Sequence, residues 1–137
     1  MATAVKYETF VEDLSNKLHD LFGTNDTVMA SIHTDAPVPS TDVSVANITQ
    51  ITGTGYASGD TQNDGTRTGG TFTCTAVDFT WTAGAADWTS TARYVSIWND
   101  TSITDRLMIS WDYGATFAVG NGETFTLDFG ASVFTLA

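Results

Sequence analysis

Apolar side chains recur every three or four residues near the start of the chain, which is the spacing of one face of an α-helix. The stripe consists of Tyr7, Phe10, Val11, Leu14, Leu18, Leu21 and Phe22. Glu8 and Glu12 lie in the first turns, where acidic side chains interact favourably with the helix dipole, and Gly23 is a common residue type at a helix end. The pattern predicts an amphipathic helix over residues 7–22. Its apolar face is expected to pack on the chain's own sheet, with a membrane surface or a partner as the alternative.

A different pattern follows the helix. Apolar and polar residues alternate over 28–33, which predicts a half-buried strand. Pro37 and Pro39 lack the N–H group that a central strand needs, so residues 37–45 are expected to form an extended surface arm that binds a partner. Residues 46–51 are expected to form a short turn or helix that buries its two isoleucines.

The stretch from Gly53 to Gly70 contains six glycines among Thr, Ser, Asp and Asn, and Tyr56 is its only large apolar residue. This composition predicts a long exposed loop or a floppy hairpin. Loops of this length in compact domains are usually functional or ordered by a neighbour, so subunit contacts are expected here; simple mobility is the alternative.

Short stretches of alternating residues follow from Thr71 to the end of the chain. They lie at 71–76, 77–81, 93–98, 107–113, 117–119, 125–129 and 133–136, with a turn region carrying Trp88 at 84–90. The phase of the alternation changes near Ala76, which predicts a bulge or a crossing. Gly120-Asn121-Gly122 predicts a tight hairpin whose second strand returns through 125–129. The whole chain, 1–137, is therefore expected to be a single, mainly β domain: an antiparallel β-sandwich or jelly roll with one N-terminal amphipathic helix and a β-rich C-terminal half at 71–137.

The stretch 93–98 carries large apolar side chains on both of its faces. Trp98 is in opposite phase to Val95 and Ile97. Either this is a central strand covered once by the opposing sheet and once by the N-terminal helix, or one of its faces meets another subunit.

Charge narrows the range of functions. Only 15% of the residues are charged, and the formal net charge is -11 with five scattered basic residues. Neutralising phosphates requires clustered Lys and Arg, so we expect no direct contact with nucleic acid and no binding to an anionic membrane. The first residues lack the apolar run of a signal peptide, and no segment has membrane-spanning length, so neither an export signal nor a span is expected.

Residues with catalytic or metal-binding chemistry are sparse. The only histidines are His19 and His33, both expected at the surface or at a strand edge, and no Gly-x-Ser-x-Gly motif accompanies them. Cys74 is the only cysteine and is expected to be a buried apolar residue, which leaves no zinc-ligand spacing. The sequence therefore predicts no enzyme activity, no metal site and no cofactor.

Carboxylates offer two weaker alternatives. Asp60 to Gly65 resembles the start of a calcium-binding loop, but Thr71 occupies the position where an EF-hand has its bidentate glutamate. A different loop-bound Ca²⁺ stays open. Asp105, Asp112 and Asp128 are candidates for a pair of glycosidase carboxylates, but solvated acids at strand edges are the expected outcome.

The C-terminal half carries a family resemblance. The motifs that carry it are residues 94–101 (YVSIWNDT), 107–114 (LMISWDYG) and 119–127 (VGNGETFTL). They resemble small virion structural proteins of tailed phages, in which an apolar strand ends in an Asn-Asp-Thr-like turn and a second ends in Asp-aromatic-Gly before a Gly-turn hairpin. The N-terminal half is similar too, with its helix, strand, Pro-containing stretch and Gly55-Tyr56 segment.

The resemblance implies a capsid decoration, or cement, protein on the outside of the phage head. It would be made in the host cytoplasm and bind the major capsid protein, often as a homotrimer, with no catalytic residues. The expected interface residues are Pro37, Val38, Pro39, Tyr56, Tyr94 and Trp98. The alternatives are a phage tail component and a carbohydrate-binding or adhesin module that stacks sugars on its Trp and Tyr side chains.

Overall fold

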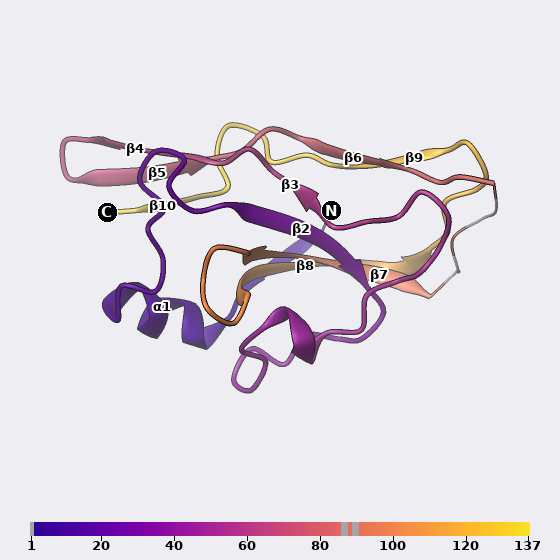
Figure 1. Ribbon diagram of the computed structural model, residues 1–137, viewed down its shortest axis with the longest axis horizontal. Helices are drawn as coiled ribbons and strands as arrows, with labels where there is room; N and C mark the ends of the chain where they lie inside the picture. Colours follow the sequence, from indigo (N-terminus) through magenta and orange to yellow (C-terminus); the bar gives the residue numbers. More distant parts are fainter. Residues whose placement is uncertain (1, 86–87, 89–90) are drawn as a thin grey trace.

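The computed structural model describes residues 2–85, 88 and 91–137 (Figure 1). The elements are β1 (Thr3–Lys6), α1 (Glu8–Ser15), β2 (Val28–His33), the 3₁₀ helix η1 (Val45–Asn47), β3 (Gly59–Asp60), β4 (Asp64–Thr68), β5 (Thr71–Thr75), β6 (Phe79–Thr82), β7 (Ala92–Asn99), β8 (Arg106–Phe117), β9 (Thr124–Leu127) and β10 (Phe134–Leu136). Most of the turn region expected at 84–90 lies outside the described residues.

The strands form two layers. One layer is a five-stranded sheet in the order β1-β8-β7-β2-β3, and the other contains the sheets β10-β5-β4 and β6-β9 (Figure 1). Every strand pair is antiparallel. The expected antiparallel β-sandwich with one N-terminal helix is confirmed.

The main core fills the space between the layers. Val95 and Ile97 of the central strand β7 pair with Ile32 and Ala30 of β2, and all four side chains are buried in this core. The opposing layer contributes Trp81 and Leu127, among others. Apolar burial of this kind is the main stabilising contribution to such a fold, at about 25 cal/mol per Å².

The other face of the five-stranded sheet is covered by the connection that follows β2. Ile48 packs there with Tyr7, Trp98 and Leu107, and Figure 1 shows η1 on the side of the sheet opposite the second layer. The prediction of a doubly covered central strand is therefore correct, but the connection around η1 covers the second face where the helix was expected. The predicted short helix and its buried isoleucines are also confirmed.

The predicted helix is too long, because α1 ends at Ser15. Lys17 takes a left-handed conformation, with φ of 59°. The N–H of Leu18 donates to the carbonyl of Asp13 at 2.9 Å, and the N–H of Lys17 donates to the carbonyl of Leu14 at 3.3 Å. This is the Schellman termination, usually made by glycine. The apolar spacing continues beyond it, but the backbone reverses.

Replacing Lys17 by Gly is expected to raise the free energy of unfolding by about 1 kcal/mol, because the left-handed conformation strains a residue with a Cβ atom. Urea unfolding measures the change. The matched control is Ser15→Gly, at the last residue of α1, which is expected to lower stability by about 0.5 kcal/mol. A Lys17→Gly variant no more stable than the wild type would contradict the left-handed assignment.

Residues 53–70 were expected to form a long exposed loop or a floppy hairpin; they are more ordered than a loop, and they include the first strand of a hairpin. They contain β3 and β4, and Thr61 and Asn63 are buried. The Asn63 side-chain oxygen accepts a hydrogen bond from the N–H of Val28 at 2.9 Å, so this segment holds the start of β2. Beyond it, β4 and β5 form a hairpin that extends past the rest of its layer (Figure 1). The polar composition therefore belongs to a narrow hairpin and not to a segment without secondary structure.

Two further predictions concern strand connections. The phase change near Ala76 is a break between two sheets of the same layer, because β5 pairs within the sheet β10-β5-β4 and β6 pairs with β9. The predicted hairpin around Asn121 is wrong: a tight turn is present, with the N–H of Glu123 donating to the carbonyl of Gly120 at 2.8 Å, but β9 pairs with β6. The turn carries the chain to the other layer.

Candidate partner-binding surface

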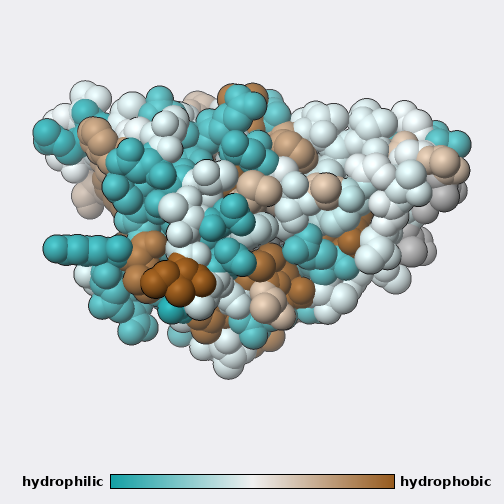
Figure 2. All heavy atoms as spheres, viewed as in Figure 1, coloured by the Kyte–Doolittle hydropathy of each residue, from teal (hydrophilic) through white to brown (hydrophobic). Residues whose placement is uncertain are grey.

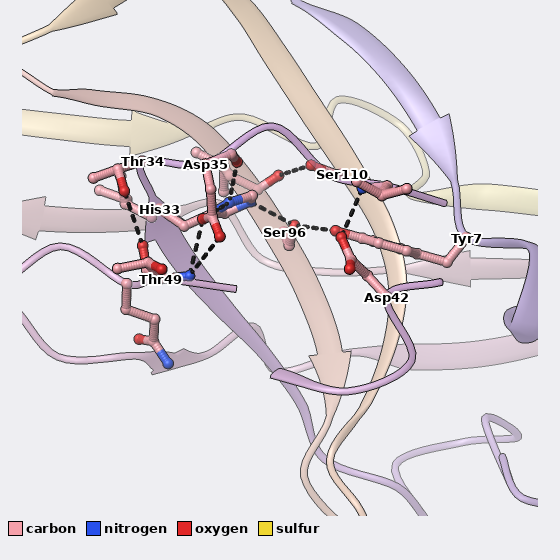
Figure 3. A network of polar contacts seen from close by, with 12 residues as sticks. Tyr7, His33, Thr34, Asp35, Asp42, Thr49, Ser96 and Ser110 are labelled. Atoms are coloured by element: carbon pink, nitrogen blue, oxygen red, sulfur yellow. Dashed lines mark hydrogen bonds and ion pairs between the residues drawn. The ribbon is translucent and has the colours of Figure 1, made fainter. Parts of the chain in front are cut away.

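The most concentrated polar chemistry lies beneath the connection after β2 (Figure 3). His33 Nδ1 is 3.0 Å from the carbonyl oxygen of Asp35, which can only accept, so Nδ1 carries the proton. His33 Nε2 then accepts from the Ser96 hydroxyl at 2.8 Å. The Tyr7 hydroxyl lies 3.1 Å from Ser96 Oγ and donates to it. One directed chain of hydrogen bonds thus joins β7 to β2 and to the residue before α1.

This chain has the Ser-His-Asp order of a hydrolase triad, since the Asp35 carboxylate is also 3.4 Å from His33 Nδ1. Ser96 and His33, however, have no solvent-exposed surface. A substrate cannot reach Ser96 Oγ in this conformation. The network satisfies polar groups beneath the sheet, and the expectation that His33 lies at an exposed edge is wrong because residues 34–51 cover it.

A second buried network involves the other histidine. His19 was expected at the surface, but the chain reversal after α1 buries it, and its Nδ1 lies 2.8 Å from Asn99 Nδ2. Asn99 also donates to Asp26 at 2.6 Å. Because Nδ1 accepts, the proton of neutral His19 is on Nε2, facing the Asp13 carboxylate at 3.9 Å.

These histidines predict a loss of stability in mild acid. Burial lowers the pKa of both His33 and His19 below the ordinary value of 6.5, and the nearby carboxylates oppose this shift without reversing it. The unfolded chain therefore binds more protons, so stability is complete above pH 6.5 and falls as the pH drops toward the folded-state pKa values. We expect the melting temperature to fall by a few degrees between pH 7.5 and 5 at constant ionic strength.

The control for this prediction is His33→Gln, which should reduce the slope of melting temperature against pH. The titration of Asp112 does not affect this measurement, because hydrogen bonds from Arg93 lower the pKa of Asp112 from 3.8 to about 2. Its contribution to stability is therefore lost only in stronger acid. A melting temperature that stays constant from pH 7.5 to 5 would contradict the buried neutral histidines.

The candidate carboxylates also have local roles. Asp112 accepts two hydrogen bonds from Arg93, at 2.7 and 2.8 Å, which favours the charged form and makes it a poor general acid. Asp60 accepts from the N–H of Gln62 at 2.8 Å within its own turn. Within residues 2–85, 88 and 91–137, no group of three or more His, Cys, Asp or Glu side chains is arranged to hold a metal ion.

The predicted interface residues divide into three groups. Val38 is exposed between the half-buried Pro37 and Pro39. The Tyr56 hydroxyl accepts a hydrogen bond from the N–H of Ile32 at 2.9 Å and donates one to the Ile32 carbonyl at 3.1 Å. These bonds hold the loop around Tyr56 to the sheet.

Tyr94 and Trp98 are buried, contrary to their expected place at an interface. The indole N–H of Trp98 donates to Ser31 at 2.7 Å, and the Tyr94 ring stacks on His33. The connection after β2 covers this face of the sheet, so neither side chain is available to a partner.

Apolar side chains that are exposed or half-buried gather at the end of the molecule that contains α1. We define the end surface as Leu14, Leu18, Phe22, Phe72, Ile103 and Leu136. Ile103, in the turn between β7 and β8, is 95% exposed, and Phe22 is 58% exposed. Figure 2 shows hydrophobic atoms over this end, near α1 and that turn.

The end surface contains two hollows. The larger, about 250 Å³, lies between the segment after α1, the β4–β5 hairpin and the C-terminal strand, and is lined by Leu14, Phe22, Phe72 and Leu136 among others. The smaller, about 160 Å³, is lined by Leu18, Ile103 and Arg106 among others. This site was not predicted from the sequence, although an isoleucine alone in the polar run from Asn99 to Arg106 was a signal for it.

A third hollow lies at the C-terminal end of β8. Its volume is about 340 Å³, and its lining includes Tyr113, Phe117, Phe125 and Glu123. The Phe117 and Phe125 rings stack on each other at 4.5 Å between centroids, so each has one face occupied. Of the four tryptophans, Trp81, Trp88 and Trp98 are buried and Trp111 is half-buried.

Comparison with known proteins adds no relative. No protein-family model matches the chain, and no curated protein or solved structure is significantly similar to it. Among the helices in the described parts of the chain, none has the length and apolar character needed to cross a membrane.

Proposed function

We propose that this chain is a structural protein of a phage particle that decorates the exterior of the capsid. In this role it binds the assembled major capsid protein, as a homotrimer, and stabilises the shell. The proposal rests on one contrast: the side chains with catalytic potential, Ser96 and His33, are enclosed, whereas large apolar side chains such as Ile103 and Phe22 are exposed on one end. Such a molecule is suited to being covered by neighbours.

Charge and mass action support the same role. A net charge of -11 favours basic patches on a capsid exterior and disfavours packaged DNA. A protein that binds only the assembled shell stabilises that shell by its binding free energy, as any ligand of one state does. The resemblance of residues 94–127 to small virion proteins of tailed phages points the same way.

The test is quantitative mass spectrometry of purified phage particles and of separated heads and tails. We expect the chain in heads, in a fixed ratio to the major capsid protein. Heads made without the chain should rupture at a lower temperature, and adding the protein back should restore the wild-type rupture temperature. Its absence from particles would overturn the proposal, and its presence only in tails would assign it to the tail.

A second candidate function is a glycan-binding module, which the aromatic hollow at Tyr113, Phe117 and Phe125 favours. Rings beside a carboxylate and hydroxyl groups are suited to a sugar. A glycan array with the wild-type protein tests this role. Binding that Phe117→Ala abolishes would support it, whereas an array without hits would favour the structural role.

A further inference from the structure

A small hollow lined only by side chains that carry oxygen has no role in the proposed function. It measures about 220 Å³ and lies between the loop before β2 and the loop between β3 and β4. Its lining consists of Thr24, Asp26, Thr27, Asp60, Gln62 and Asn63. No lysine or arginine is among these lining residues, so none of them compensates the charge of the two carboxylates.

Asp26 leaves one carboxylate oxygen for a ligand. Asp26 is only 7% exposed, and its Oδ2 accepts hydrogen bonds from the N–H of Asp20 and from the Asn99 amide, each at 2.6 Å. Its Oδ1 accepts none from the described residues, yet this oxygen is not enclosed. Burial of a carboxylate is costly unless hydrogen bonds or a cation compensate it. A cation in the hollow would compensate Oδ1.

Asn63 requires a second property of the ligand. It is 3% exposed, and its Oδ1 accepts from the N–H of Val28 at 2.9 Å, which leaves Nδ2 as the free end of the amide. Nδ2 has no hydrogen-bond partner within the described parts of the chain. An amide nitrogen can only donate, so it needs an acceptor such as a water oxygen. A ligand that fits must therefore combine positive charge with an acceptor.

We propose that this hollow binds a hydrated calcium ion. Ca²⁺ takes about six to eight oxygen ligands, drawn from carboxylates, amide carbonyls and water. Asp26 and Asp60 supply negative charge, Gln62 supplies a carbonyl oxygen, and a water molecule on the ion accepts from Asn63. A lysine or arginine side chain of a partner carries donors alone and would leave Asn63 unpaired.

The proposed site differs from the calcium-binding loop that the sequence resembles. Asp60 and Gln62 belong to both, but Asp64 lies in β4 and does not line the hollow, whereas Asp26 comes from another loop. Because only two carboxylates contribute, we expect a dissociation constant of about 0.1–1 mM, as in extracellular calcium-binding modules.

Binding is expected to stabilise the fold, because the ion joins two loops that the folded chain brings together. The Thr61 hydroxyl already donates to the carbonyl of Val28 at 2.8 Å across this junction. A ligand of the folded state alone raises stability by mass action. The inference does not depend on the capsid, because the isolated protein is sufficient to test it.

The first experiment titrates the full chain with CaCl₂ to about 10 mM at constant ionic strength, followed by calorimetry and by ¹⁵N NMR. We expect saturable binding, with the largest changes in the amide signals of residues 24–27 and 60–63. The melting temperature should rise by a few degrees at saturation. Mg²⁺ should bind at least about tenfold more weakly, because it loses its water reluctantly and requires octahedral geometry.

Asp60→Asn should raise the dissociation constant for Ca²⁺ at least about tenfold, because the site loses one of its two charges. Asp60 is exposed, and asparagine retains the oxygen that accepts from the N–H of Gln62 at 2.8 Å, so the variant should fold. Asp64→Asn is the matched control. It removes the same charge from an exposed acid of the same segment that does not line the hollow, and should change the dissociation constant less than about twofold.

Three outcomes would overturn the inference. The first is no binding up to about 10 mM Ca²⁺. The second is equal weakening by Asp60→Asn and Asp64→Asn, which would indicate general attraction to an acidic surface. The third is a hollow whose amide signals respond to N-acetylarginine amide and not to Ca²⁺, which would assign it to a basic side chain of a partner. Binding to purified phage heads, measured separately, tests the capsid role alone.

Discussion

Replacing Asn99 by Leu is expected to lower the free energy of unfolding by about 3–5 kcal/mol, because leucine preserves the volume and removes every side-chain hydrogen bond. The Asn99 amide donates to Asp26 and to His19, and its oxygen accepts from the N–H groups of Thr101 and Ser102 at 2.9 and 3.2 Å. All of Asn99 is buried. The substitution leaves several enclosed polar groups without partners, in a domain class whose total stability is about 5–15 kcal/mol.

Urea unfolding followed by tryptophan fluorescence measures this loss. The matched control is Asn25→Leu, because the Asn25 amide makes one exposed hydrogen bond, to Asp20 at 3.0 Å. That control should change stability by less than about 1 kcal/mol. If the two variants unfolded at the same urea concentration, Asn99 would not be the centre of this network.

The strands were largely predictable from the sequence because alternation reports directly on a two-faced sheet. The strands β2 and β7 lie where the patterns at 28–33 and 93–98 place them. Pairing was less predictable. The Gly120–Gly122 turn is compatible both with a local hairpin and with a crossing to the other layer, and only long-range packing of β9 on β6 decides between them.

Burial of polar residues was the main feature that the pattern did not predict. His33 was expected at the surface or at a strand edge, yet the connection after β2 covers it and it pairs with the buried Ser96. The helix was overextended for a related reason: the apolar spacing continues through Phe22, but the left-handed Lys17 sends those residues into the core or onto the end surface. Irregular backbone has no periodicity from which it can be predicted.

The end surface was missed because it is assembled from segments far apart in the chain. Phe22, Phe72, Ile103 and Leu136 come from four separate connections and strands. None of their local patterns indicates that they converge. These residues converge because the segment after α1 makes a close backbone contact with the β4–β5 hairpin. A substitution that disrupts this contact therefore tests whether the end surface is assembled in this way.

Replacing Gly65 by Ala is expected to disrupt this contact and to lower the free energy of unfolding by about 3 kcal/mol or more. Gly23 and Gly65 exchange backbone hydrogen bonds at 2.7 and 3.0 Å, and a Cβ atom on Gly65 would lie well inside contact distance of the Leu21 carbonyl oxygen. Backbone atoms cannot move aside as a flexible side chain does. The control is Gly70→Ala, in open space at the hairpin tip, which should change stability by less than about 0.5 kcal/mol, as measured by urea unfolding. A Gly65→Ala variant as stable as the control would mean that the hairpin does not lie against this segment, and the hollow lined by Phe22, Phe72 and Leu136 would lose one of its walls.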